Sequence, residues 1–172
     1  MAYSLLMAVG ARSAPVRSRL LILAALTCLA AAAGLGAAGT LQPPDQFIGF
    51  RVGADNQLAR WDKIVEYMKL AASASDRVRV QELGASTDGN PFIAVLVGDS
   101  DTIKNLERYR QYQRRLYFRK GTPSARERDE IFRQGKAVVV ITAGVHSTEV
   151  GPTQATLELV HRLATDDSPA TK

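Results

Sequence analysis

The sequence predicts an α/β fold with a mixed parallel and antiparallel sheet and helices on both faces of that sheet. Three observations lead to this prediction. A β-branched apolar run covers Ala137–Ile141, which is typical of a strand buried on both faces of a parallel sheet. Arg77–Leu83, in which apolar and polar residues alternate, and the apolar stretch Phe92–Val97 flank a turn cluster and predict an antiparallel hairpin. Amphipathic helical patterns lie before, between and after these strands, as expected for an α/β fold.

Residues 1–38 are predicted to be a signal peptide and not part of the fold. Three arginines precede an apolar run over Leu20–Ala33, and the small residues Gly36-Ala37-Ala38 supply a cleavage site. The alternative is an uncleaved membrane anchor, because residues 20–38 are just long enough to span a bilayer. The Ala and Gly content of this run favours cleavage. We therefore expect a secreted or periplasmic protein that starts near Gly39 and contacts a membrane only through this segment.

The charge of the chain does not indicate a nucleic-acid partner. The net charge of all 172 residues is +5, but residues 39–172 contain 19 Lys and Arg against 17 Asp and Glu, a net charge of +2. A nearly balanced charge gives no reason to expect nucleic-acid binding. The single cysteine, Cys28, lies inside the predicted signal peptide, so the remainder cannot be a scaffold held together by disulfides.

The first elements after the signal peptide are an extended lead-in over Leu41–Phe50 and an amphipathic helix over Asn56–Ala72. Apolar side chains recur in this helix every three to four residues, with charged residues between them, so one face should pack on the core. The side chains expected on that face are Leu58, Trp61, Val65, Met68 and Ala72. Phe47 and Phe50 in the lead-in are expected to pack on the edge of the domain.

Two further helices are predicted between the hairpin and the central strand, and one after it. Thr102–Phe118 has a basic outer face, which we interpret as solvated; a surface for an anionic partner is the alternative. Its inward side chains are Ile103, Leu106, Tyr109, Gln113 and Leu116. Ser124 opens a short helix that ends at Gln134. The last helix covers Pro152–Ala164, and its predicted inner face comprises Thr156, Leu159, Val160 and Leu163.

Polar side chains follow the central strand immediately, within the stretch AVVVITAGVHSTEVGP. Ligands bind at the carboxyl ends of strands in open α/β sheets. His146 and Glu149 can converge there only if the segment between them turns, which the flanking Gly144 and Gly151 permit. Convergence would form two-thirds of a His₂Glu zinc site with one position left open for water. The residues alone leave a second interpretation open, in which both are polar loop side chains.

The stretch AGVHSTEVGPTQATLEL resembles the zinc carboxypeptidase family, the carboxypeptidase A-like metallopeptidases. In that family an H-x-x-E after a central strand supplies the first two zinc ligands. A second stretch, ELGASTDGNPFIAVLVGD with a helix ending YRQYQRRL, resembles the hairpin and first crossover helix of secreted bacterial members. The resemblance covers residues 42–164 and implies that residues 39–172 are the N-terminal, incomplete part of such a catalytic domain.

The resemblance implies an exported zinc-dependent metallocarboxypeptidase that hydrolyses peptide bonds in a peptide or protein substrate. It assigns one zinc ion to His146 and Glu149. The third ligand and the general-base glutamate lie far downstream in the family, so no catalytic residue is identifiable here and the 172 residues alone should be inactive. His161 is expected to be an exposed helix residue and not a ligand. The alternatives are a zinc deacylase or amidase of related fold and a non-catalytic exported binding module; the oligomeric state is not predicted.

Overall fold

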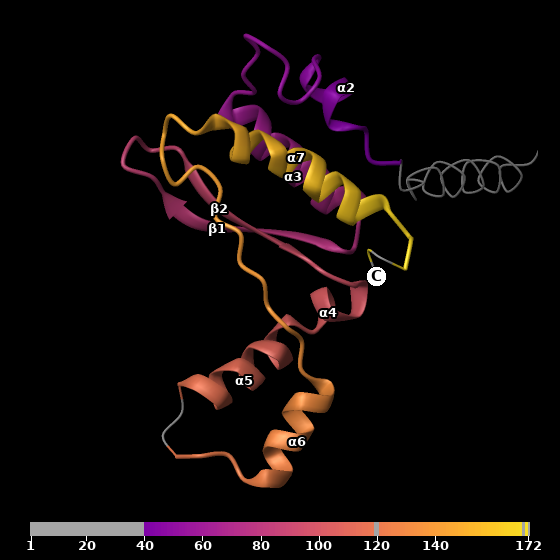
Figure 1. The fold of residues 1–172 in the computed structure, drawn as a ribbon, viewed down its shortest axis with the longest axis vertical. Helices are drawn as coiled ribbons and strands as arrows, with labels where there is room; N and C mark the ends of the chain where they lie inside the picture. The colour runs from indigo at the N-terminus through magenta and orange to yellow at the C-terminus, as the bar shows by residue number, and fades with distance from the viewer. Residues whose placement is uncertain (1–39, 119–120, 170, 172) are drawn as a thin grey trace, which may run out of the picture. The chain divides into compact units, whose positions relative to one another are not determined.

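The computed structural model describes residues 40–118, 121–169 and 171. The predicted signal peptide, residues 1–38, lies outside the described residues. The elements are α2 (Pro44–Ile48), α3 (Trp61–Ala74), β1 (Val78–Ala85), β2 (Pro91–Val97), α4 (Ser100–Lys104), α5 (Leu106–Tyr117), α6 (Ala125–Gln134) and α7 (Val150–Thr165) (Figure 1). None of the described helices combines the length and the apolar character that crossing a bilayer requires.

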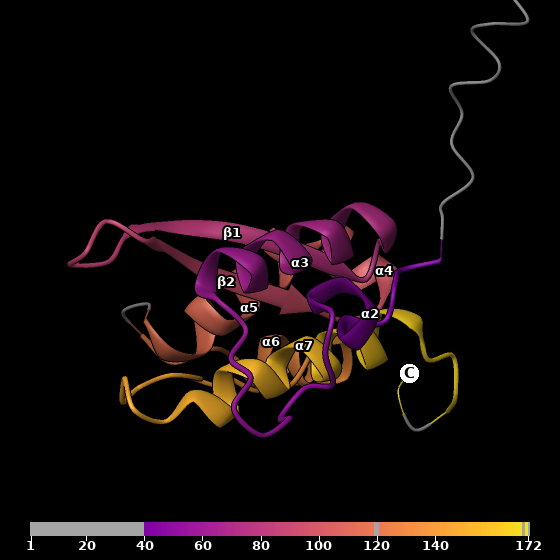
Figure 2. The same ribbon diagram turned by 90° about the horizontal axis from the view of Figure 1, so that it is seen from above.

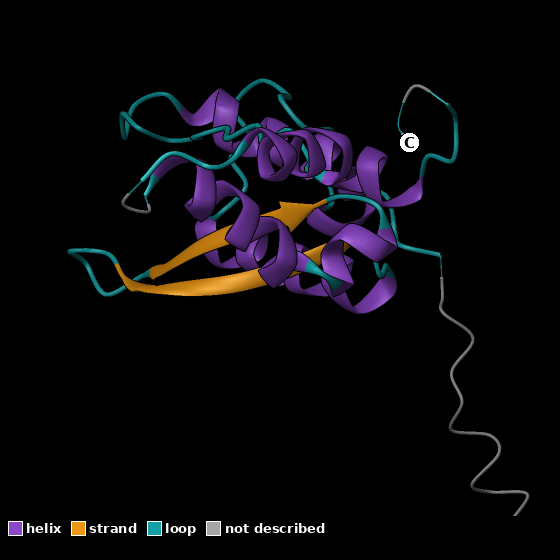
Figure 3. Cartoon of the chain, turned by 90° about the horizontal axis from the view of Figure 1, so that it is seen from below, coloured by secondary structure: helices purple, strands orange, loops and turns teal. Residues whose placement is uncertain are grey.

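The predicted hairpin is present. β1 and β2 pair antiparallel, with Val78 opposite Val97, and the register shifts at a bulge between Glu82 and Gly84. The connecting turn is closed by a hydrogen bond from the Gly89 N–H to the Ser86 carbonyl, 2.9 Å long. Figure 3 shows these two strands as the sheet of the described residues, so the antiparallel part of the predicted mixed sheet is confirmed and the parallel part is not shown.

The predicted central strand Ala137–Ile141 is not formed in this structure. The segment has no regular hydrogen bonding, and Val138, Val139, Val140 and Ile141 are 66–81% exposed. A strand exists only where its backbone N–H and C=O groups pair with a neighbour, and no described segment pairs with this one. The prediction of a buried strand over Ala137–Ile141 is therefore wrong for the described residues.

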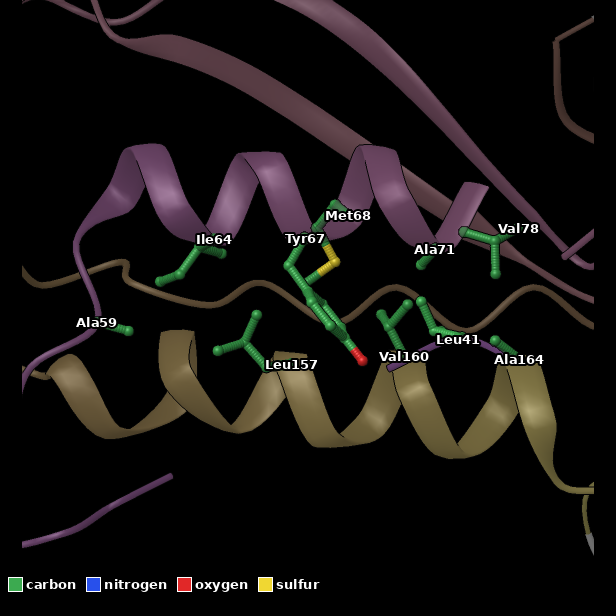
Figure 4. Close-up of a cluster of buried hydrophobic side chains, with 10 residues drawn as sticks. All are labelled: Leu41, Ala59, Ile64, Tyr67, Met68, Ala71, Val78, Leu157, Val160 and Ala164. Atoms are coloured by element: carbon green, nitrogen blue, oxygen red, sulfur yellow. The ribbon is translucent and has the colours of Figure 1, made fainter. Parts of the chain in front are cut away.

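The core lies between α3, α7 and the hairpin. Figure 2 shows α3 next to the hairpin and facing α7, and Figure 4 shows side chains of the two helices interleaved. Tyr67, Met68 and Leu157 are fully buried. The Tyr67 hydroxyl donates a 2.8 Å hydrogen bond to the Gln42 carbonyl, and burial raises the pKa of this phenol to about 12. The cluster comprises Leu41, Ala59, Ile64, Tyr67, Met68, Ala71, Val78, Leu157, Val160 and Ala164.

The lead-in is helical where the sequence predicts an extended segment. Pro44 occupies the first turn of α2, where its fixed φ suits a helix and its missing N–H costs nothing. Gly49 ends the helix in the left-handed conformation at φ +84°. Phe47 and Phe50, which were expected on the edge of the domain, are partly buried and pack against the core cluster.

The long helix predicted over Thr102–Phe118 is divided into α4 and α5 at Asn105. The Asn105 side-chain amide donates a 2.9 Å hydrogen bond to the Asp101 carbonyl, and this local bond competes with helical hydrogen bonding. The Ser124 cap is confirmed, because its hydroxyl accepts a 3.2 Å bond from the Glu127 N–H. The predicted inner face of α7 is shifted: Leu159 is exposed, and the buried residues are Gln154, Leu157, Val160 and Ala164.

Candidate functional site

The segment between Ile141 and α7 positions the two candidate metal ligands. Gly144 has a φ of +75°, which turns the chain after the extended apolar run. A turn follows, in which the Glu149 N–H donates a 3.0 Å hydrogen bond to the His146 carbonyl. Glu149 then stands immediately before the first residue of α7, and its side chain makes no capping hydrogen bond to that helix. The turn leaves the Glu149 carboxylate available for another contact.

His146 and Glu149 meet through their side chains. Nδ1 of His146 lies 3.0 Å from Oε2 of Glu149, and the side chains are 68% and 58% exposed. The convergence expected from the sequence is therefore present, on the open surface of the described part of the chain. A hydrogen bond between a protonated imidazole nitrogen and the carboxylate accounts for this contact without any metal, so the role of the pair as ligands stays a prediction.

The donor set of this pair fits zinc. An imidazole nitrogen and a carboxylate oxygen are both zinc donors, at roughly 2.0–2.2 Å from the ion. Two donors on one tetrahedral ion then lie roughly 3.4 Å apart, so the observed 3.0 Å pair would need to open by only a few tenths of an ångström. Among the described residues, no group of three or more His, Cys, Asp or Glu side chains is close enough to hold a metal ion. The described residues therefore provide two donors of a site that requires more.

His161 does not complete the site within the described residues. It is half-buried on α7, and its Nε2 lies 3.3 Å from the Leu41 carbonyl oxygen. The prediction of an exposed helix residue is thus incorrect in detail, because the N-terminal segment covers this histidine. The expectation that it is not a ligand stays a prediction.

Gly144 is also constrained by a contact from α7. A Cβ atom on Gly144 would lie 2.7 Å from Oγ1 of Thr153, closer than real Cβ contacts come. Only glycine fits both this approach and the positive φ. Thr153 therefore excludes any side chain at position 144, a constraint that the sequence did not reveal because it depends on a residue nine positions later.

A pocket with a volume of about 200 Å³ adjoins the pair. One wall comes from the chain entering α3 and the other from the turn and the start of α7. It is lined by Leu58, Ala59, Trp61, Ile64, Gly144, His146, Ser147, Glu149, Val150, Thr153 and Gln154. A larger hollow of about 270 Å³ lies between α5 and α6, but it encloses the Arg115–Glu127 ion pair and neither candidate ligand, so the smaller pocket is the relevant one.

Gln154 joins the two walls of the pocket. The residue is 4% exposed, and its Oε1 accepts a 3.1 Å hydrogen bond from the Ala59 N–H. On the same wall, the Trp61 indole N–H donates a 3.0 Å bond to the Pro91 carbonyl. The sequence pattern did not predict this role of Gln154, and the signal for it is a polar residue on the same helical stripe as Leu157 and Val160.

Comparison with known proteins provides one match. The model of a family described as zinc carboxypeptidase matches residues 64–172, a region that begins in α3 and includes both His146 and Glu149. No curated protein and no solved structure matches the chain.

Proposed function

The chain belongs to the zinc carboxypeptidase family, and from this premise we propose that it forms part of a zinc-dependent metallocarboxypeptidase in which His146 and Glu149 hold one zinc ion. One observation supports this assignment above all. Within the matched region, Nδ1 of His146 and Oε2 of Glu149 face each other at 3.0 Å. Two atoms of the types that bind zinc are therefore already close enough to contact the same ion.

The chemistry of the proposed site follows from its donors. When bound, a zinc ion supplies Lewis-acid polarisation of a peptide carbonyl and lowers the pKa of a coordinated water to about 7. His146 must present an unprotonated Nδ1 to serve as a donor, and the Glu149 carboxylate offsets part of the positive charge. Gly144 holds the turn that brings the two side chains together. Both side chains are largely exposed, so the described residues leave the pair open to a peptide.

We propose that the third zinc ligand and the general base come from outside the described residues. Catalytic zinc sites of the His₂Glu type use three protein ligands and a water. The His161 imidazole contacts the Leu41 carbonyl oxygen, and no third metal-ligating side chain lies near the pair in the described part of the chain. We therefore expect residues 39–172 alone to lack peptidase activity. The exposed run Ala137–Ile141 suits a central strand of the mixed sheet once strands from outside the described residues pair with it.

We also propose that the protein is exported and that its substrate is a peptide or a protein. The arginines and apolar run of residues 1–38 support a cleaved signal peptide, and hence a secreted or periplasmic enzyme acting on peptides or proteins. The near-balanced charge of residues 39–172 supports the absence of a nucleic-acid partner.

The proposal is tested with the complete protein on peptides that have a free C-terminus and on the same peptides amidated there. We expect release of the C-terminal residue only from the free acids, loss of that release with a zinc chelator, and at least a hundredfold loss of kcat/KM in Glu149→Gln, about 2.7 kcal/mol of transition-state stabilisation. Glu158→Gln, on the exposed face of α7, is the matched control and should retain activity. Full activity in Glu149→Gln, or cleavage of N-acyl substrates alone, would contradict the proposal.

A further inference from the structure

We propose that the outer face of α5 is a membrane-contact surface that binds the headgroups of anionic phospholipids. This arginine–aromatic face comprises Arg110, Arg114, Tyr117 and Phe118. A lipid contact here goes beyond the proposed function and does not depend on the zinc site. It replaces the expectation that residues 1–38 alone contact a membrane, and it gives the basic surface of this helix an anionic partner.

The arginine–aromatic face lies on the side of α5 that does not contact α6. The other side of α5 faces α6, where Arg115 pairs with Glu127 (Figure 1). Arg110, Arg114 and Phe118 are four residues apart along the chain, so they share one stripe of the helix. The Phe118 N–H donates a 2.9 Å hydrogen bond to the Arg114 carbonyl, which continues this stripe to the end of α5. Contacts with α6 therefore leave the face uncovered.

Two aromatic side chains at the end of α5 are open to solvent. Tyr117 is 74% exposed and Phe118 is 81% exposed. An aromatic ring gains free energy when it leaves water, and neighbouring exposed apolar side chains mark surfaces that meet a protein or a membrane. A solvated basic face accounts for the arginines of α5 but leaves these two rings without a role.

The arginines of the face lie next to these rings. Arg114 and Arg110 are exposed and lie about one and two helical turns before Phe118. Nε of Arg110 is 2.8 Å from Oε2 of Glu107, but both side chains are 62% exposed, and such ion pairs contribute little. Arg110 can therefore exchange this carboxylate for a phosphate, which a guanidinium group binds through two parallel hydrogen bonds. Rings beside cations match the boundary between phospholipid headgroups and acyl chains.

Positive charge is concentrated in the segment that carries the face. Residues 100–136 contain 11 Lys and Arg against 5 Asp and Glu, a net charge of +6, whereas the rest of residues 39–172 contains 8 against 12, a net charge of −4. Arg126 and Arg133 on α6 form no ion pair with other described residues and add to the positive potential. An anionic leaflet attracts a cationic segment and repels an acidic one. This segregation therefore favours an orientation with α5 toward the lipid.

Lipid fits these features better than two other anionic partners. The centre of a protein interface is depleted in charged residues, whereas the cations here are spread over both α5 and α6. A soluble acidic polymer would use the cations but would not remove the two rings from water. An anionic membrane surface uses the spread of positive charge and the exposed rings together.

Co-sedimentation with lipid vesicles tests this proposal. The experiment uses the complete protein in the form that begins at Gly39, because an apolar signal segment binds vesicles by itself. The probes are vesicles of phosphatidylglycerol and phosphatidylcholine in equal parts, and vesicles of phosphatidylcholine alone are the zwitterionic control. We expect binding to the first and not to the second. Binding should decrease in about 1 M NaCl, where the Debye length is only about 3 Å.

Matched substitutions separate the contribution of the rings from that of the charges. Phe118→Ser should weaken vesicle binding by about tenfold or more, whereas Phe118→Trp keeps an aromatic ring and should retain it. Arg114→Gln should weaken binding by about fivefold. The controls Leu83→Ser and Arg79→Gln change exposed residues of β1 and should bind as the unmodified protein does. Circular dichroism checks that each variant folds, and either Phe118→Ser or Arg114→Gln decides the outcome if the other does not fold.

Three results would overturn the membrane contact. They are equal binding to both kinds of vesicle, no binding to the phosphatidylglycerol vesicles, and unchanged affinity in Phe118→Ser. The third result would instead assign the basic surface to a soluble polyanion. Cleavage of peptides in solution depends on the proposed zinc ligands and should be unchanged in Phe118→Ser, so failure of the membrane contact is distinguishable from failure of the proposed function.

Discussion

The structure contains two pairs of amphipathic helices that are held together in different ways. One pair is α3 and α7, and the other is α5 and α6. α3 and α7 interleave apolar side chains (Figure 4). Five residues of α3 and four of α7 are buried. α5 has no buried residue and α6 has one, Ile131. α5 and α6 are joined mainly by polar contacts, such as the 2.9 Å bond from Arg115 Nη2 to Glu127 Oε2.

The difference shows that helical periodicity predicts a helix and not its depth of burial. An amphipathic stripe becomes buried only where a second apolar surface meets it. For α3 that surface is supplied by α7 and the hairpin, whereas α5 and α6 meet each other with arginine and glutamate side chains. We therefore expect the free energy of unfolding to depend on the first pair much more than on the second.

The largest expected effect is in the apolar pair. Leu157→Ala removes a side chain with 0% exposure and should lower the free energy of unfolding by about 2–5 kcal/mol. Leu159→Ala, two residues away on the same helix and 38% exposed, should cost well under half as much. Urea unfolding of both variants makes the comparison, and equal losses would show that α7 does not face α3 as described.

The next effect concerns the turn that joins the exposed segment to the core helix. Gly144→Ala forces a Cβ toward Thr153 Oγ1 at a positive φ, and should cost about 1–3 kcal/mol of stability. Gly151→Ala is the control, because a Cβ there meets open space and alanine favours helix, so no loss is expected. Thermal unfolding of the two variants distinguishes them. A harmless Gly144→Ala would mean that the turn has a different conformation.

A smaller effect is expected in the polar pair. Arg115→Gln removes the ion pair with Glu127, and partly exposed pairs contribute about 0.2–1 kcal/mol. Global stability should therefore change by less than 1 kcal/mol, while amide hydrogen exchange in α6 should accelerate. A global loss as large as that of Leu157→Ala would eliminate the contrast between the two helix pairs.

The smallest effect is at the end of α7 and depends on pH. Hydrogen bonds from the Thr171 hydroxyl and from Ser168 lower the pKa of Asp166 from 3.8 to about 2. The pKa is lower in the folded state, so this contact stabilises the fold above pH 3.8 and its contribution is lost as the pH falls toward 2. Amide exchange at residues 166–168 should therefore accelerate over that interval, and Asp166→Asn should abolish the pH dependence. An unchanged profile in Asp166→Asn would assign the transition to another group.

Features set by neighbours in the sequence could be predicted. The hairpin depends on its turn residues, the start of α6 on Ser124, and the meeting of His146 and Glu149 on glycines that permit a turn. Each involves residues within a few positions of one another. Local chemistry decides such features before any tertiary contact forms.

Features set by distant contacts could not be predicted. A strand at Ala137–Ile141 requires pairing partners, which the described residues do not provide, so a strong strand pattern remains an exposed extended segment. Gln154 acquires its role from a hydrogen bond to Ala59, 95 positions earlier in the chain. The sequence does not distinguish the inner face of α7, because Leu157 and Leu159 are equally apolar and only packing against α3 selects between them.

The proposal that His146 and Glu149 bind zinc is tested by measuring the affinity of the complete protein for zinc. Competition with a chromophoric chelator should yield one tight site in the unmodified protein. His146→Ala should weaken that site more than the roughly 10–100-fold expected for loss of an outer-shell partner. His161→Ala should leave it unchanged, because that imidazole contacts the Leu41 carbonyl. Equal zinc affinity in His146→Ala and the unmodified protein would contradict the assignment.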